Sequence, residues 1–226
     1  MMTYMGIDGC RGGWIVAVID KEGKLSHLVI PSLNDLPDIS PQLVLIDIPL
    51  EFADQSYRSC EIAAQLLLGS RKRASIFLTP HRSAVFAINY SEANRLNRLY
   101  LGKGLSKQGW NICNKIKEAT LFIAQRPEVP LLEAHPELCF YFLNNCKPLL
   151  SKKSLSEGAA DRLRIIAEHE PNYLQVITDT IKATKRKTVK LDDIIDATIL
   201  AIRAKATNIQ TAPVDRHIGD RDAILF

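Results

Sequence analysis

The sequence predicts an α/β protein with a mixed β-sheet flanked by helices and a helical insertion in the middle of the chain. Three observations lead to this class. Short β-branched runs joined by glycine turns open the chain, a nearly continuous apolar run follows at Leu43–Pro49, and apolar residues at helical spacing recur through most of the remainder. An antiparallel meander followed by an all-apolar strand is typical of sheets that combine antiparallel and parallel strands.

The opening stretch, Met5–Trp14, is the one around which the rest of the chain is organised. A short apolar run brings Asp8 to a turn predicted at Gly9 and at Gly12–Gly13, and a second strand is predicted over Trp14–Asp20. Because a buried, unpaired carboxylate is costly, Asp8 needs a cation or hydrogen bonds. A hydrogen bond from its own turn is the simpler alternative.

A third strand and a central strand follow. Leu25–Ile30 completes a predicted three-strand meander, and a short helix is predicted within Ser32–Ile39. The run Leu43–Pro49 has the composition of a strand buried on both faces, and Asp47 is its only charge. Since Pro49 ends the strand just past it, Asp47 is a second carboxylate at a strand end.

Helices are predicted over most of segment 51–128, which is too long for a single crossover connection. We therefore treat residues 1–226 as one domain with a helical insertion at about 51–128. The basic cluster Arg71–Arg73 suits either the C-terminal end of a helix or a phosphate contact. The predicted bounds are Ser56–Leu68, ended by Gly69, then Ser91–Tyr100 and Asn114–Gln125, and outside the insertion a helix at Ala159–Glu168 and an edge strand at Ala223–Phe226.

The densest set of acid/base side chains follows a short strand that begins at Pro130. Glu133, His135 and Glu137 lie within five residues of one another, and a helix is predicted over Pro136–Leu143 with proline at its first position. Such residues can act as metal ligands or proton donors. The alternative for Glu137 is a favourable charge in the first turn of that helix.

The last predicted helix, Leu191–Lys205, carries three carboxylates in its first turns. Asp193 and Asp196 are three residues apart, so they share a helix face. Asp192 is the predicted N-cap. Capping also remains an alternative for Asp193, whereas Asp196 lies too far into the helix for that explanation.

Composition limits the class of protein. The chain has 226 residues, of which 46% are hydrophobic and 24% charged, and it contains no 18-residue apolar run. Its N-terminus lacks the pattern of a signal peptide, so we expect a cytoplasmic protein without a membrane partner. The five scattered cysteines without a C-x-x-C pair indicate reduced thiols. A net charge of +4 is compatible with a polyanionic partner.

The order of elements resembles the RNase H-like fold. In that fold, acidic residues at the ends of the first strand, the fourth strand and the last helix hold two divalent cations about 4 Å apart for phosphodiester hydrolysis. More narrowly, an ordered set of motifs over nearly the whole chain resembles a prokaryotic family of predicted RNase H-like nucleases, catalogued as domain of unknown function 429. The motifs are GIDGCRGGW, IDIP, SIFLTPHR, LSKQGWNICNKIKE, EAHPE and DDIIDA.

The resemblance implies a metal-dependent nuclease that acts on DNA or RNA with Mg²⁺ or Mn²⁺, cations that prefer carboxylate and water ligands. The implied metal ligands are Asp8, Asp47, Asp193 and Asp196. The other implied catalytic residues are Glu133 or Glu137, as a further ligand or a base that orients water, and His135, as donor to the leaving oxygen. The implied substrate contacts are Arg82, Gln108 and Lys115.

Two other functions fit the same residues. Phosphotransferases of the actin-like and sugar-kinase-like type share a related meander, with a glycine-rich first turn that binds nucleotide phosphates. They usually use two such domains around a cleft. The third hypothesis is a catalytically inactive nucleic-acid-binding module. Divalent metal separates the three, because a nuclease binds it without nucleotide, a phosphotransferase mainly with nucleotide, and a binding module weakly or not at all.

Overall fold

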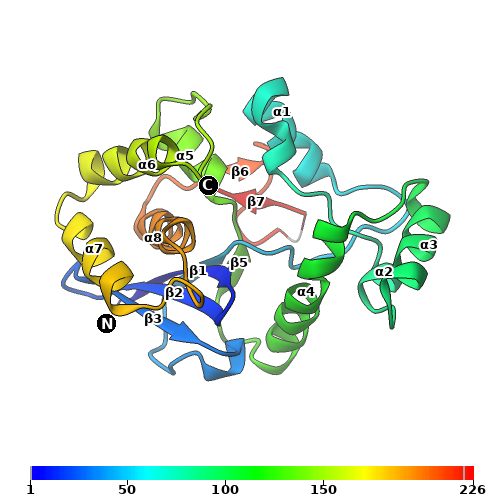
Figure 1. Cartoon of the computed structure of the whole chain (residues 1–226), viewed down its shortest axis with the longest axis horizontal. Coiled ribbons are helices and arrows are strands. Elements are labelled where there is room, and N and C mark those ends of the chain that lie inside the picture. The colour runs from blue at the N-terminus through cyan, green and yellow to red at the C-terminus, as the bar shows by residue number, and fades with distance from the viewer. Residues whose placement is uncertain (1, 221) are drawn as a thin grey trace.

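A computed structural model describes residues 2–220 and 222–226 and contains a five-stranded mixed sheet flanked by helices (Figure 1). The strands lie in the order β3-β2-β1-β4-β5. The first three form the predicted antiparallel meander, and β4 and β5 run parallel to β1. Their bounds are β1 (Tyr4–Cys10), β2 (Gly13–Ile19), β3 (Leu25–Ile30), β4 (Leu43–Ile46) and β5 (Leu131–Glu133).

The register places Asp8 beside Asp47. Ile7 of β1 pairs with Ile46 of β4, and the Asp47 amide donates a 3.0 Å hydrogen bond to the Ile7 carbonyl. Strand β1 continues through Cys10, so the turn predicted at Gly9 is wrong. Ladder bonds to β2 hold Gly9 opposite Trp14 and move the turn outward.

Five helices lie on one side of the sheet and share one core with it (Figure 1). Helix α8 packs directly on β1 and β2 and is in turn covered by α5, α6 and α7. Its close approach depends on Gly6, where a Cβ atom would lie 2.1 Å from the Ala197 carbonyl oxygen. The bounds on this face are α1 (Ser59–Lys72), α5 (Pro136–Leu143), α6 (Ser156–His169), α7 (Tyr173–Ala183) and α8 (Leu191–Lys205).

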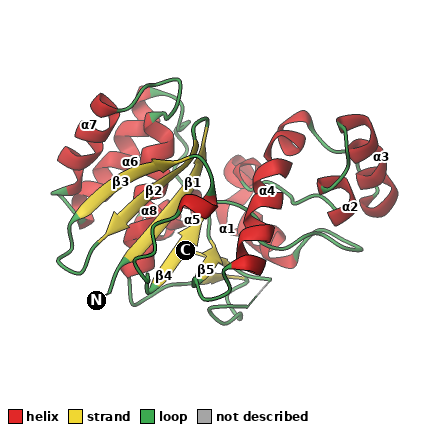
Figure 2. Cartoon of the chain, turned by 90° about the horizontal axis from the view of Figure 1, so that it is seen from below, coloured by secondary structure: helices red, strands yellow, loops and turns green. Residues whose placement is uncertain are grey.

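The opposite face of the sheet is covered mainly by α4, which packs Ile116 and Phe122 into a second core with Trp14 and Ile46. Helices α2 and α3 lie beyond α4, away from the sheet (Figure 2). The bounds here are α2 (Arg82–Val85), α3 (Tyr90–Leu101), α4 (Lys107–Gln125) and the short 3₁₀ turns Leu33–Asp35 and Arg73–Ser75.

The C-terminal tail forms a second, two-stranded sheet. Strand β7 (Ile224–Leu225) pairs with β6 (Thr211–Ala212), and Leu225 also forms a bridge to Ala134 just after β5. The strand predicted at the tail therefore exists, although its main partner is β6. Among residues 2–220 and 222–226, no helix is long and apolar enough to cross a membrane.

Some helix boundaries differ from the prediction. Helix α4 begins at Lys107, seven residues before the predicted Asn114, because the Ser106 side chain caps it by accepting from the Gly109 amide at 3.0 Å. A glycine in the first turn weakens the helical pattern there. Helix α1 runs on to Lys72 through a kink at Gly69, and α7 was not predicted.

Candidate functional site

A cavity of about 840 Å³ opens at the carboxyl ends of the parallel strands. Asp8 from β1, Asp47 from the residue after β4 and Asp193 from the first turn of α8 line it. The ends of parallel strands leave their last backbone groups and side chains outside the sheet, which is the usual place for a site in such folds. Three of the four predicted metal ligands therefore lie in one cavity.

Asp196, the fourth, is brought to Asp8 by backbone packing. Gly6 and Asp8 are two residues apart in β1, so both point to the face on which α8 lies. Asp196 precedes Ala197, the residue whose carbonyl contacts Gly6. Asp196 is 1% exposed and Asp8 is 8% exposed, so both carboxylates are largely withdrawn from water.

The clustered acids raise one another's pKa values. Burial, followed by the negative charges of Asp47 and Asp196, raises the pKa of Asp8 well above its ordinary value. Burial also raises the pKa of Asp196 to about 6, against the opposing effect of Lys153. The pKa of Asp193 is raised as well, again mainly by burial. The negative charge of Asp47 thus disfavours ionisation of both Asp8 and Asp196.

Lys153, which the sequence analysis did not single out, supplies positive charge to this cluster. Its Nζ atom lies 2.7 Å from Asp196 Oδ2, and the nearby charge of Asp196 raises the pKa of Lys153. The other oxygen, Asp196 Oδ1, is buried and has no hydrogen-bond partner within the described part of the chain. Lys153 lies between α5 and α6 in a polar stretch that has no motif, so no local sequence signal could have identified it.

The donor set matches a hard divalent cation in chemistry, since it consists of carboxylate oxygens and includes an unpartnered buried oxygen at Asp196. No group of three or more His, Cys, Asp or Glu side chains among the described residues is arranged to hold a metal ion. Lys153 is the cation that approaches Asp196, and Asp8 and Asp47 also act on its charge. A cation bound at Asp196 would share this carboxylate with the Lys153 ammonium group or replace that group.

Asp193 also caps its helix. Its Oδ2 atom accepts a 2.9 Å hydrogen bond from the backbone amide of Lys190, the N-cap residue of α8. The prediction that Asp192 is the N-cap is therefore wrong, because the N-cap is Lys190, two residues earlier, and Asp192 lies inside the first turn. Asp193 therefore caps its helix and also lines the cavity.

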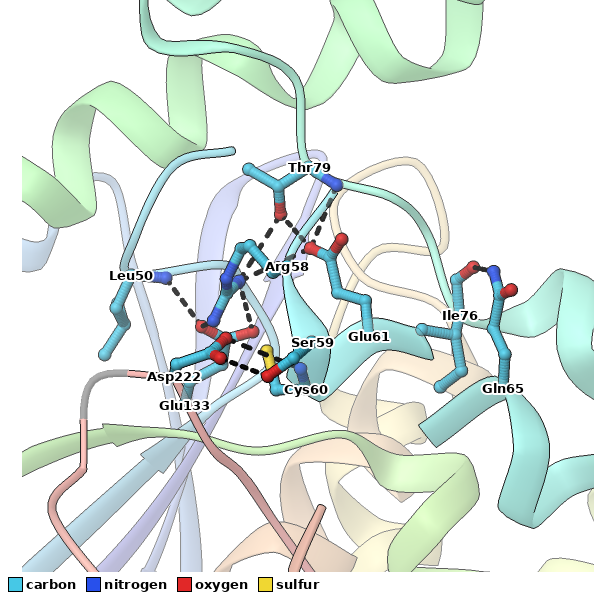
Figure 3. A network of polar contacts seen from close by, with 10 residues as sticks. All are labelled: Leu50, Arg58, Ser59, Cys60, Glu61, Gln65, Ile76, Thr79, Glu133 and Asp222. Atoms are coloured by element: carbon cyan, nitrogen blue, oxygen red, sulfur yellow. Dashed lines mark hydrogen bonds and ion pairs between the residues drawn. The ribbon is translucent and has the colours of Figure 1, made fainter. Parts of the chain in front are cut away.

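Glu133 lines the same cavity but is held by a buried arginine (Figure 3). The two terminal nitrogens of Arg58 donate to the two Glu133 oxygens at 2.9 and 2.7 Å, and the Leu50 amide donates to Oε2 at 2.9 Å. Arg58 also lies 3.4 Å from Glu61, whose pKa is raised by burial to about 7. A bidentate contact of this kind fixes the orientation of Glu133.

Glu137 and His135 are likewise held by contacts with side-chain and backbone groups of the protein. Glu137 forms an ion pair with Arg162 and lies 3.7 Å from the Lys72 ammonium nitrogen. His135 caps α5 by accepting from the Glu137 amide at Nδ1, and Nε2 donates to the Ser75 carbonyl at 3.2 Å. With one nitrogen accepting and the other donating, the ring is neutral. Both residues line the cavity, and their catalytic roles stay predictions.

Two of the three predicted substrate contacts lie at the cavity. Gln108 and Lys115 line it from α4, and the Lys115 ammonium group donates to the Gly13 carbonyl and lies 3.9 Å from the Trp14 ring centre. Burial lowers the pKa of Lys115. Arg82 lines a separate cavity of about 540 Å³ instead.

The rim of the first cavity is basic. Besides Lys115 and Lys153, its lining includes four cationic residues from four different parts of the chain, of which all but Lys72 are exposed. Acidic residues at the floor and cations at the rim suit a ligand that brings its own negative charges and accepts cations between them. The four residues are Arg11, Lys72, Lys152 and Lys190.

Fold and site together define an α/β protein with a carboxylate cluster at the carboxyl ends of its parallel strands. The chain belongs to the family described as "Protein of unknown function (DUF429)", whose profile matches residues 6–221. Neither a search of curated proteins nor a search of solved structures finds a match.

Proposed function

We propose that this protein is a metal-dependent nuclease with an RNase H-like fold, which hydrolyses phosphodiester bonds at the carboxylate cluster. One observation carries the proposal: Asp8, Asp47 and Asp196 share a largely buried site at which one Asp196 oxygen has no partner. Burying like charges together is unfavourable without a compensating cation. A site that binds divalent cations from solution explains why the chain keeps several acids there.

The fold supports this proposal. An antiparallel meander followed by two strands parallel to the first is the arrangement of RNase H-like sheets, and the acids lie where that fold places them, at β1, after β4 and on the last long helix. A pair of divalent cations at such a site would stabilise the attacking and leaving oxygens of the substrate phosphate.

The residues of this chain take distinct parts. Asp8, Asp47, Asp193 and Asp196 would hold the cations, and the basic rim would orient a substrate with several phosphates. Glu133 and Glu137 keep their arginine partners in this proposal and support the floor of the cavity. Arg58 and Arg162 leave each of them with little freedom to reach a cation.

Thermal unfolding with and without millimolar Mg²⁺ or Mn²⁺ tests the proposal without knowledge of the substrate. A ligand at about 100 times its dissociation constant stabilises the native state by about 2.7 kcal/mol, which corresponds to a rise of about 5–10 °C in Tm for a chain of this size. We expect that rise in the unmodified protein and its loss in Asp8→Asn and Asp196→Asn. Asp192→Asn, on the same helix but outside the cavity lining, should keep it.

Three results separate the hypotheses. Stabilisation by metal alone that both cavity variants abolish supports the nuclease, and Mg²⁺-dependent cleavage of nucleic acid should then be lost in the same variants. If stabilisation requires both metal and a nucleotide, the phosphotransferase hypothesis replaces the nuclease proposal. If neither addition raises Tm, the chain is an inactive module and the proposal fails.

A further inference from the structure

The helical insertion is the most basic part of the molecule. Residues 76–117 contain seven lysines and arginines against a single acid, Glu92, for a net charge of +6. The whole chain carries +4, so the rest of the protein is net negative. Concentrating positive charge in one segment favours a polyanionic partner at that segment.

Aromatic and cationic side chains alternate along one surface of this insertion, which we call the aromatic–basic strip. Arg82 lies 5.5 Å from the Phe86 ring centre, and Lys117 lies 5.9 Å from the rings of both Phe86 and Trp110. Trp110 packs edge-on against Tyr90 at 6.5 Å, and Lys107 lies 3.9 Å from the Tyr90 ring. The strip consists of Arg82, Phe86, Tyr90, Lys107, Trp110 and Lys117.

The strip is accessible, and ion pairs do not neutralise its cations. Arg82 and Lys107 are exposed, and the Phe86 ring is 42% exposed although phenylalanine favours the core. Within residues 2–220 and 222–226, none of Arg82, Lys107 and Lys117 has an acidic side chain within ion-pair distance. The three cations contact aromatic rings instead, so their charge remains available to a ligand.

We propose that the aromatic–basic strip binds a single-stranded segment of nucleic acid. Unpaired bases can stack on aromatic faces such as those of Phe86 and Trp110, while neighbouring cations contact the phosphates between them. The partner must be single-stranded, because the bases of a duplex are already stacked and paired. DNA and RNA share the bases and phosphates on which this recognition depends.

Helix α4 connects the strip to the cavity. Lys107, Trp110 and Lys117 recur at intervals of three and seven residues and lie on one side of the helix. Gln108 and Lys115 lie on another side and line the cavity. A strand held on the strip would therefore lie against the same helix that lines the cavity of the carboxylate cluster. The inference thus names the substrate form for the proposed nuclease, whereas the binding itself requires neither metal nor catalysis.

Fluorescence anisotropy in EDTA tests the strip separately from the metal site. The probes are labelled 20-nucleotide oligo(dT) and oligo(U), compared with a duplex of equal length. We expect at least one single strand to bind at least about tenfold more tightly than the duplex, and Phe86→Leu and Trp110→Leu each to weaken that binding by about 5- to 100-fold. Lys117→Gln should lower the slope of log affinity against log salt by about 0.7.

Matched controls keep the result specific. Lys182→Gln removes the same charge from the exposed surface of α7, on the opposite side of the molecule from α3 (Figure 1), and should change binding little. Asp8→Asn should bind single strands like the unmodified protein, so that failure of the metal site and failure of the strip are distinguishable. Equal affinity for duplex and single strand, or no effect of the two aromatic substitutions, would overturn the proposal.

Discussion

Lys153 is the residue on which the charge state of the carboxylate cluster depends. It is the ion-pair partner of Asp196, a side chain that is 1% exposed, and Asp8 and Asp47 act on the same ammonium group. A buried carboxylate that loses its cation is strongly disfavoured. The lysine therefore stabilises the fold without metal and competes with metal for the same oxygens.

Lys153→Met should lower the free energy of unfolding without metal by about 1–3 kcal/mol, because Asp196 loses a charged hydrogen bond. The same variant should gain more stability from Mg²⁺ than the unmodified protein does. Urea unfolding at pH 7.5, with and without Mg²⁺, measures both effects. Lys152→Met, an exposed neighbour on the same loop, is the control, and equal behaviour of the two variants would contradict the prediction.

Arg58 balances two buried carboxylates at once. Arg58→Met would leave Glu133 and Glu61 without their shared cation, and we expect a loss of about 3–5 kcal/mol in the free energy of unfolding. The urea midpoint measures this loss. Adding Glu133→Gln should recover part of it by removing one stranded charge. Arg164→Met breaks only an exposed pair with Glu168 and should cost less than about 1 kcal/mol, so a similar cost in both would refute the prediction.

Local pattern identifies acids at the ends of elements and misses partners that only the tertiary fold supplies. Asp8 and Asp47 could be singled out because a charge in an apolar strand is conspicuous in the sequence. Asp196 could be singled out because it lies beyond the reach of capping. Arg58 and Lys153 could not, since each lies in a polar segment and meets its carboxylate across a gap of more than forty residues in the sequence.

At the scale of elements, prediction succeeds where the apolar pattern itself marks both ends of the element. The bounds of β3, α5 and α8 match the predicted ones. Those of α4 do not, because Gly109 weakens the helical pattern of its first turn, although this glycine packs closely against Leu105 and Phe77. Helix α7 lies between two charged stretches of the sequence. Its apolar face can be recognised only from the tertiary structure, in which it packs against β3 and α8.

Gly6 sets the distance between β1 and α8. A Cβ atom there would lie 2.1 Å from the Ala197 carbonyl and 2.3 Å from the Ala201 amide, both of them backbone atoms that cannot move alone. Gly6→Ala should therefore cost at least about 2 kcal/mol and reduce stabilisation by Mg²⁺, since Asp196 moves with the helix. Thermal unfolding measures both.

Gly9→Ala is the control for Gly6, because the three atoms nearest to a Cβ atom at Gly9 all belong to the flexible side chain of Lys115. A Gly6→Ala protein as stable as Gly9→Ala would show that α8 can shift without cost.

His27 makes the packing of α7 and α8 on β3 sensitive to pH. Its two ring nitrogens lie 2.9 Å from the hydroxyls of Thr180 and Thr198, and burial lowers its pKa from 6.5 to about 4. Between these values the unfolded chain binds a proton that the folded protein does not. His27 therefore lowers stability as pH falls through this window and has no effect above about pH 7.

From pH 7.5 to pH 5, this one residue should reduce the free energy of unfolding by about 2 kcal/mol. His27→Gln keeps a side-chain amide that can donate to a threonine hydroxyl but does not titrate, so its stability should fall less over the same range. Urea unfolding of both proteins at the two pH values yields the difference. Parallel pH curves for the two proteins would contradict the assignment.

The helical insertion is part of the main fold at the scale of the whole molecule. Its ends lie at the neighbouring strands β4 and β5, its α1 helix joins the core on the α8 side of the sheet, and its α4 helix packs on the other side. The sequence predicts the existence of the insertion from its length and helical composition. It could not predict that the two helices separate to the two faces, because both have similar amphipathic patterns and the choice depends on contacts made after folding.

The burial of α8 divides the site into two parts that should open on different timescales. Residues 194–204 of this helix are all buried, so its amides should exchange with solvent deuterium only when the whole chain unfolds. The segment that carries Lys153 is exposed and should exchange through local opening. Hydrogen exchange followed by mass spectrometry can measure both rates. Asp196 would then stay in place while the segment that carries Lys153, its counter-ion, opens and closes many times between two global unfolding events.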